Sequence, residues 1–181
     1  MLRQTRFPKL TLLAVLTVCP MLGAAAGVAA DTGEEKLAKR VRHELVTLPY
    51  LSVFDHLVFR VEDGQVTLSG QVVRPTLKSS AENVVKRLEG VTQVVNRIEV
   101  LPLSPYDDRV RLAVLRSVYS QPSLQKYGLG ALASIQIIVK NGEVTLEGLV
   151  NNEGDRNIAF LRANGVSGVF KVTNNLRVVR G

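Results

Sequence analysis

Cysteine and histidine, which commonly build metal centres, disulfides and catalytic sites, are scarce in this chain of 181 residues. Cys19 is its one cysteine, and its two histidines, His43 and His56, do not stand in the HxxxH or HExxH spacing of metal ligands. No serine lies in a Gly-x-Ser-x-Gly setting, and Gly128-x-Gly130 lacks the third glycine of a phosphate-binding loop. These absences predict a protein that is not an enzyme and that uses no metal and no cofactor.

The first thirty residues have the composition of an export signal. A basic leader without acidic residues precedes an apolar run over residues 10–18, and small residues follow Pro20. Two alanines end this stretch before Asp31, so residues 1–30 are predicted to be a signal peptide that is cleaved after Ala30. The apolar run is short for a bilayer, which disfavours the alternative of a membrane anchor.

Cys19 gives this segment a second interpretation. Leu16-Thr17-Val18-Cys19 is similar to a lipoprotein processing site, at which the cysteine would be acylated. Val18 stands where such sites have a small residue, and apolar residues follow where a polar tether is usual. Lipidation is therefore the alternative. After cleavage at Ala30 the chain contains no cysteine and needs no disulfide.

What the chain does contain is an internal repeat. The octapeptide DGQVTLSG at 63–70 recurs as NGEVTLEG at 141–148, and across 63–100 and 141–178 12 of 38 positions are identical. A fixed-offset repeat predicts two copies of one folding unit, here residues 31–103 and 104–181. The shared positions are turn residues and alternating apolar residues, so the repeat is a scaffold. Its polar and glycine positions are Gly64, Gly70, Gly90 and Asn96 in the first copy and Gly142, Gly148, Gly168 and Asn174 in the second.

Net charge differs between the two copies. Residues 31–103 carry ten basic and ten acidic side chains, whereas residues 104–181 carry ten and six. The surplus of positive charge therefore belongs to the second copy. In an exported protein this surplus predicts an anionic lipid or polymer as partner and disfavours nucleic acid.

Each copy is predicted to fold as helix, strand, strand, helix and strand. Asp63-Gly64 and Asn141-Gly142 favour tight hairpin turns, because both central residues of such a turn need positive φ. Apolar residues at helical spacing predict the helices around 37–48, 77–88, 110–118 and 158–166, and the last strands are expected at 94–101 and 172–179. The fold class is thus α+β, with two tandem αββαβ modules, each a three-stranded sheet covered by two helices on one face.

The motifs of both copies resemble those of the BON-domain family. The resemblance rests on the Asp63–Gly70 hairpin, on Gly90-Val91-x-x-Val94-Val95-Asn96 and on the equivalent residues of the second copy. It implies a periplasmic protein of the bacterial envelope that binds phospholipid surfaces and takes part in osmotic or envelope stress. BON modules also occur attached to secretins and channels, so the resemblance does not fix one function.

Lipid binding is expected chiefly from the second copy. Its first helix carries three arginines, and its loop before the hairpin is longer than that of the first copy. Basic side chains attract anionic headgroups, and apolar loop residues can enter a membrane interface. The alternatives are an ordinary solvated helix, an Arg111 that points away from the face shared by Arg109 and Arg116, and a loop whose leucines cover the core. The predicted lipid-binding residues are Arg109, Arg111, Arg116, Lys126, Tyr127, Leu129 and Leu132.

The sequence therefore predicts a non-enzymatic exported protein that binds anionic phospholipid surfaces. The alternative function is an adaptor or chaperone-like factor for envelope proteins, which would use the open face or edge of a sheet. Asn96 and Asn174 are expected to turn the chain into the last strand rather than to bind a ligand.

Overall fold

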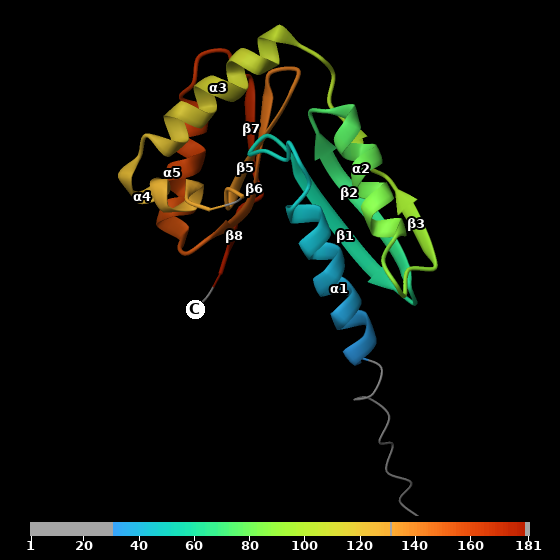
Figure 1. Ribbon diagram of the computed structural model, residues 1–181. Coiled ribbons are helices and arrows are strands. Elements are labelled where there is room, and N and C mark those ends of the chain that lie inside the picture. Colours follow the sequence, from blue (N-terminus) through green and yellow to red (C-terminus); the bar gives the residue numbers. More distant parts are fainter. Residues whose placement is uncertain (1–30, 131, 180–181) are drawn as a thin grey trace, which may run out of the picture.

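The computed structural model describes residues 31–130 and 132–179, and, apart from an added short helix and 3-10 turn in the second half, its helices and strands repeat in the same order in the two halves of the chain (Figure 1). The predicted signal peptide and Cys19 lie outside the described residues. The first module contains α1 (Asp31–Val46), β1 (His56–Glu62), β2 (Gln65–Val72), α2 (Pro75–Lys86), β3 (Gln93–Asn96) and β4 (Glu99–Val100). The second contains α3 (Pro105–Tyr119), α4 (Pro122–Gln125), the 3-10 turn η1 (Lys126–Gly128), β5 (Ile135–Lys140), β6 (Glu143–Val150), α5 (Glu153–Asn164), β7 (Lys171–Asn174) and β8 (Arg177–Val178).

Each sheet is built around the second strand of its hairpin. In the first module β2 pairs antiparallel with β1 on one side and parallel with β3 and β4 on the other. The second module repeats this arrangement around β6. Both residues of each hairpin turn have positive φ, 48° and 78° at Asp63 and Gly64 and 54° and 77° at Asn141 and Gly142. The α+β fold and the predicted hairpin turns are confirmed.

The last strand of each module is broken in two, which differs from the single strand that the sequence predicts. The side chain of Asn96 accepts a hydrogen bond from the backbone N–H of Ile98 and donates to the carbonyl of Lys78 in α2. Asn174 makes the equivalent bonds in the second module. The break turns Ile98 into the core, where its side chain is 1% exposed. The repeated asparagine therefore positions the chain within the strand pair and ties it to a helix.

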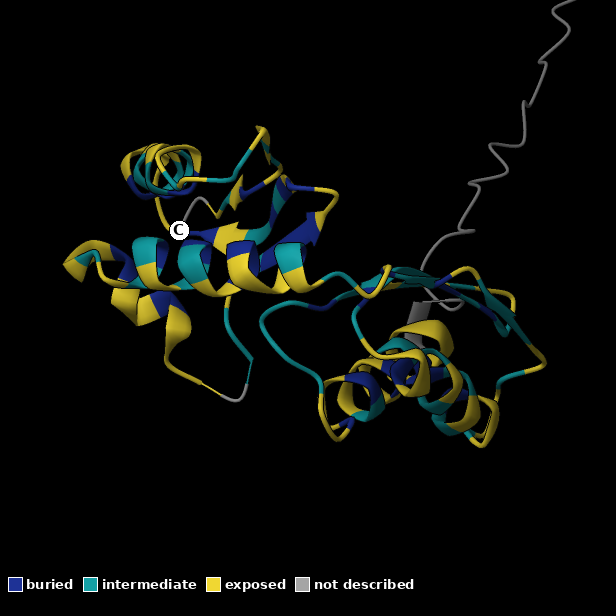
Figure 2. Ribbon diagram, turned by 90° about the horizontal axis from the view of Figure 1, so that it is seen from above, coloured by how far each residue is buried: buried dark blue, intermediate teal, exposed yellow. Residues whose placement is uncertain are grey.

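Two helices cover one face of each sheet, and the view from above shows their buried residues turned toward the strands (Figure 2). In the first module Val41 of α1, Ala81 of α2 and Val66 of β2 are fully buried in one cluster. Burial of such side chains stabilises a module by about 1.5–3 kcal/mol for each large aliphatic residue. In the second module α5 ends at Asn164, so Gly165 caps the helix and does not lie within it as the apolar pattern suggested.

A glycine at the same position of each hairpin lets the second strand lie very close to the backbone at the start of the hairpin. A Cβ on Gly70 would lie 2.0 Å from the carbonyl oxygen of His56, and one on Gly148 would lie 2.0 Å from that of Ser134. Real side chains cannot approach a backbone so closely, and both residues have φ above 100°. The shared glycines are therefore explained by backbone geometry.

The two modules contact one another beyond the linker. The N–H of Ile137 in β5 donates to the carbonyl of Val53 at 2.8 Å, and Val53 and Phe54 pack against the core of the second module. An ion pair of 2.6 Å joins Lys140 to Glu99. The described part of the chain has no helix that is both long and apolar enough to cross a membrane.

Candidate functional site

Helix α3 is the element that carries the predicted arginines. Ser104 caps its first turn by accepting a hydrogen bond from the N–H of Asp107, and Pro105 occupies the position where an N–H is not needed. The buried stripe of Val110, Val114 and Val118 fixes the rotation of the helix against the sheet.

The outward face of α3 presents two arginines and a leucine. Arg109, Leu112 and Arg116 follow at intervals of three and four residues, and all three are exposed. Leu112 leaves 45% of its surface in contact with solvent. Neither arginine forms an ion pair with another described residue. We call these three residues the outward face of α3.

Arg111 does not belong to this face, which corrects its place among the predicted lipid-binding residues. It lies two positions after Arg109, which rotates it by about 200° around the helix, and it is 2% exposed. Its guanidinium pairs with Asp108 and donates to the carbonyl of Val139 at 2.8 Å. Arg111 therefore fastens α3 to the edge of β5 and cannot reach a headgroup.

Tyr127 is also buried, and it organises the loop that follows α4. The side chain is 4% exposed, and its hydroxyl donates to Asp155 at 2.6 Å while accepting from the N–H of Asn151 at 2.8 Å. Its predicted role at a membrane interface is therefore wrong, because the hydroxyl and the ring are both used inside the module.

The side chain of Lys126 contacts both Asp155 and solvent. Its ammonium lies 2.8 Å from Asp155, although 47% of its side chain stays exposed. The hydrogen bond to Asp155 raises the pKa of Lys126. Burial would raise the pKa of Asp155, but hydrogen bonds from Lys126 and Tyr127 outweigh burial and hold the pKa of that carboxyl below its usual range. The positive charge of Lys126 is thus largely committed to Asp155.

The two leucines of the long loop have different surroundings. Leu129 is 79% exposed, so the alternative that it covers the core does not apply to it. Leu132 is half-buried and lines a groove between the two modules. The structure therefore leaves Arg109, Arg116 and Leu129, with part of Lys126, available to an external surface.

Phe170 is a surface residue that the sequence analysis missed. Its ring is 74% exposed and is stacked on Tyr106, with 5.9 Å between the ring centroids. The hydroxyl of Tyr106 donates to the carbonyl of Gly168 at 2.7 Å, which fixes the turn that carries Phe170. The signal was present in the repeat, because Phe170 occupies the position of Thr92 and is followed by Lys171 where the first module has Gln93.

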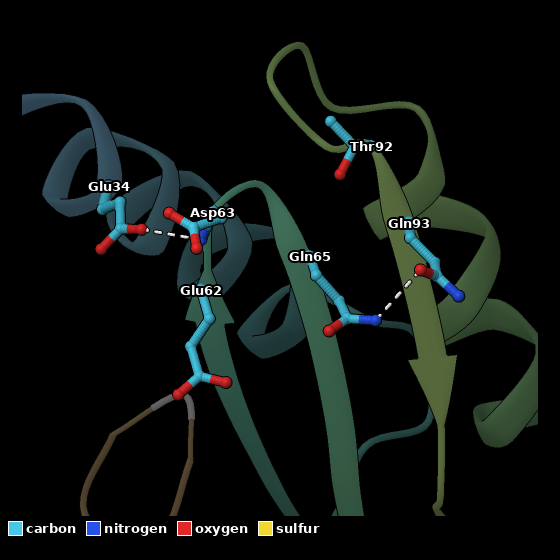
Figure 3. Close-up of a pocket in the computed structure, with 6 residues that line it drawn as sticks. All are labelled: Glu34, Glu62, Asp63, Gln65, Thr92 and Gln93. Atoms are coloured by element: carbon cyan, nitrogen blue, oxygen red, sulfur yellow. Dashed lines mark hydrogen bonds between the residues drawn. The ribbon is translucent and has the colours of Figure 1, made fainter.

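The same end of the first module is acidic. Figure 3 shows a hollow beside the first hairpin turn into which Glu34, Glu62 and Asp63 contribute side chains. Two carboxylates of this hollow have local partners, since Glu34 accepts from the N–H of Asp63 at 2.9 Å and Glu62 forms an ion pair of 2.9 Å with Arg60. A hollow of this charge repels anionic headgroups. Within residues 31–130 and 132–179, no group of three or more acidic, histidine or cysteine side chains is placed to hold a metal ion.

The histidines do not form a common site. His43 is exposed on α1, and His56 on β1 lies 4.0 Å from Glu147 of the second module. His56 thus contributes to the contact between modules.

Two solved structures of CdsD, a structural protein of the type III secretion system of Chlamydia trachomatis, are similar at 16% identity. The first, of the C-terminal domain, has a TM-score of 0.29 over 80% of this chain and 98% of that chain. The second has a TM-score of 0.30 over 81% and 93%. These scores are too low to carry a functional argument. No match was found among curated proteins.

The family model of the BON domain matches the chain twice, over residues 33–102 and 107–180. These two segments contain the two αββαβ modules described above, each with its Asp-Gly or Asn-Gly hairpin and its broken last strand. The chain belongs to the BON domain family and carries two tandem BON domains.

Proposed function

We propose that this protein is an exported, non-enzymatic protein that binds anionic phospholipid surfaces through its second BON domain. BON domains are associated with phospholipid binding and with proteins of osmotic and envelope stress. The single observation that supports this site is the outward face of α3, where two arginines flank an exposed leucine without a described acidic partner.

Binding would proceed by electrostatic attraction and then by shallow apolar contact. Each basic side chain near an anionic surface contributes about 1 kcal/mol. Leu129 follows α4 and η1 and Phe170 stacks on the first turn of α3, so they supply apolar contacts near opposite ends of this helix. The acidic hollow of the first domain favours an orientation in which the second domain faces the lipid.

The test is sedimentation of the mature chain with vesicles of phosphatidylglycerol and phosphatidylcholine. Arg109→Glu combined with Arg116→Glu should lower the partition coefficient at least about thirtyfold, since two favourable charges are lost and two unfavourable ones are added. High salt should weaken binding of the unchanged chain.

A matched control on α1 changes the net charge by the same amount. Lys36→Glu combined with Lys39→Glu lies on the first helix of the first domain and should leave vesicle binding within about threefold, because these side chains lie outside the proposed contact. Equal losses in the two variants, or indifference to lipid charge, would contradict the proposal.

We propose the periplasm as the location, with cleavage after Ala30 and no acylation of Cys19. The basic leader and short apolar run of residues 1–30 support this. Mass spectrometry of the exported chain should find Asp31 at its N-terminus, and an acylated Cys19 would contradict it. The role of adaptor for envelope proteins stays the alternative, which a dominant protein cross-link without lipid binding would favour.

A further inference from the structure

A groove of about 340 Å³ lies between the two BON domains. One wall is made by α1, β1 and the segment between them, and the other by residues 132–136 with β6 and β8. Pockets that hold small ligands usually span about 300–1,000 Å³, so this groove is large enough for one small molecule. It is separate from the outward face of α3, whose three residues do not line it.

Apolar side chains from both domains line part of the groove. Leu57 and Phe59 of β1 are half-buried, and Leu149 of β6 leaves 45% of its surface exposed. Val46, at the end of α1, is 40% exposed. Apolar surface that stays in contact with water is unfavourable, so a ligand with a hydrocarbon chain would gain affinity by covering it.

One arginine from each domain lines the same groove. The guanidinium of Arg42 lies 5.7 Å from the ring centroid of Phe59, and Arg177 projects from β8. Both are exposed, and neither forms an ion pair with another residue in the described ranges. The groove thus combines apolar walls with positive charge that lacks a described acidic partner.

The acidic groups nearby do not cancel this charge. Asp55 lines the groove but is 4% exposed, and its carboxylate accepts hydrogen bonds from the N–H and hydroxyl of Ser52 and from the N–H of Val73. Glu147 is directed to His56, at 4.0 Å, and accepts from Asn175 at 2.7 Å. A negatively charged ligand would therefore meet the arginines without a competing free carboxylate in the lining.

The internal repeat shows that the scaffold does not require these residues. Leu149 and Arg177 are register partners across β6 and β8, and the same two positions in the first domain hold Gln71 and Glu99. There the pair is joined by a hydrogen bond of 3.2 Å from Gln71 to Glu99. One backbone thus accepts an apolar and basic pair or a polar and acidic pair, so the fold does not account for the choice in the second domain.

We propose that the groove between the domains binds a single monomeric anionic amphiphile, such as a free fatty acid. Its carboxylate would pair with Arg42 and Arg177, and its chain would lie along Leu57, Phe59 and Leu149. Arginine binds carboxylates well because its planar donors match the two carboxylate oxygens. The proposal does not depend on membrane binding, since it uses different residues.

The test is calorimetric titration of the mature chain with decanoate below its micelle concentration. Decanoate should bind at one site, decyltrimethylammonium should bind at least about tenfold more weakly, and butyrate should not bind measurably, because both the charge and the chain are needed. Equal affinity for the cationic amphiphile, or decanoate binding at many sites, would overturn the proposal.

Variants then locate the site. Arg42→Glu combined with Arg177→Glu should weaken decanoate binding at least about tenfold, and Leu149→Gln, which copies the first domain, about threefold. Arg109→Glu combined with Arg116→Glu changes the net charge equally and should leave decanoate affinity unchanged. Equal losses in the two charge variants would show that only long-range attraction is measured, and would overturn the site.

A measurement on the unchanged chain keeps the test independent of how the variants fold. Backbone amide resonances of Leu57, Phe59 and Leu149 should shift on addition of decanoate, whereas those of the outward face of α3 should not. Shifts confined to α3 would contradict the groove. Vesicle binding by the Arg42 and Arg177 variant should persist, so that failure of this proposal and of the membrane proposal can be distinguished.

Discussion

The hairpin turn of the first domain is flanked by Glu62 and Gln65, whereas the turn of the second is flanked by Lys140, which pairs with Glu99, and by Glu143, and has the exposed ring of Phe170 beside it. At the offset of 78 residues, Glu62 of the first domain corresponds to Lys140, and Thr92 corresponds to Phe170. The hairpin turns between these positions have nearly the same φ values in both domains. The identities of the repeat thus specify a backbone, and the differences at exposed positions give the two copies different surfaces.

Helices α1 and α3 also correspond to each other, but at a sequence offset other than 78 residues. Leu37, Val41 and Leu45 of α1 have the spacing of Val110, Val114 and Val118 of α3, and all six are buried. In this alignment Glu34 of the first domain occupies the position of Asp107 in the second. Both carboxylates accept from the N–H groups of a hairpin turn, but Glu34 is exposed and makes one such bond, whereas Asp107 is 0% exposed and makes two.

The largest expected difference between the domains comes from these two carboxylates. Asp107→Asn should lower the free energy of unfolding by about 1–3 kcal/mol, because an amide NH2 replaces one acceptor and leaves unpaired either the buried N–H of Gly142 or the partly buried N–H of Asn141. Glu34→Gln should cost less than about 0.5 kcal/mol, because its site is solvated. Urea denaturation of the two variants measures both values, and equal losses would show that burial does not separate the two turns.

Exchanging the residues at positions 170 and 92 tests whether the aromatic ring accounts for lipid contact by the second domain. Phe170→Thr copies the first domain and should lower the vesicle partition coefficient about tenfold, since an apolar contact with the interface is lost. Thr92→Phe should raise it less than about twofold, because Glu62 and Asp63 flank the new ring. Co-sedimentation with anionic vesicles measures both, and a strong gain from Thr92→Phe would contradict the assignment of lipid contact to the second domain.

The smallest expected effect concerns stability at high pH. Burial raises the pKa of Tyr119 to about 12, although its hydroxyl donates to the carbonyl of Ile135. A raised folded pKa contributes stability that is fully present below the ordinary value of 10 and is lost as the pH rises through about 12. The unchanged chain should therefore lose on the order of 1 kcal/mol of its free energy of unfolding between pH 9 and 11.5, after allowance for the partial exposure of Tyr119. Tyr119→Phe should not show this loss.

Urea denaturation at several pH values provides that measurement. Tyr50→Phe serves as the control, because Tyr50 is 71% exposed in the first domain and its ring is not part of either core. The alkaline loss should persist in the control. Its persistence in Tyr119→Phe would show that another group titrates.

Local chemistry made much of the fold predictable from the sequence. The Asp-Gly and Asn-Gly pairs determine the hairpin turns, and helical spacing of valines predicts α3. The exposure of Arg109 and Arg116 follows from the same spacing. The same spacing turns Arg111 away from them, but its hydrogen bond to Val139 was not predictable in this way, because Val139 lies 28 residues along the chain. Phe170 likewise depends on Tyr106, which packs against it only in the folded domain.

The break in each last strand was missed for a similar reason. A run such as Val94 to Leu101 has the composition of one strand, and the bond from Asn96 to Lys78 that interrupts it links two elements. The groove between the domains was beyond sequence reasoning because its walls come from segments about 90 residues apart, such as Phe59 and Leu149. Contacts of this kind follow from packing rather than from pattern.

The outer edge of β5 determines whether a partner peptide could add a strand to the sheet of the second domain. Three groups already occupy the backbone positions that a further strand would use: the Tyr119 hydroxyl on Ile135, the Val53 carbonyl on Ile137, and the Arg111 guanidinium on Val139. An incoming peptide would have to displace all three before it could extend that sheet. Recruitment by strand addition is thereby blocked at this margin of the second domain, and Arg111, whose sequence suggested contact with lipid, instead helps to exclude a peptide strand.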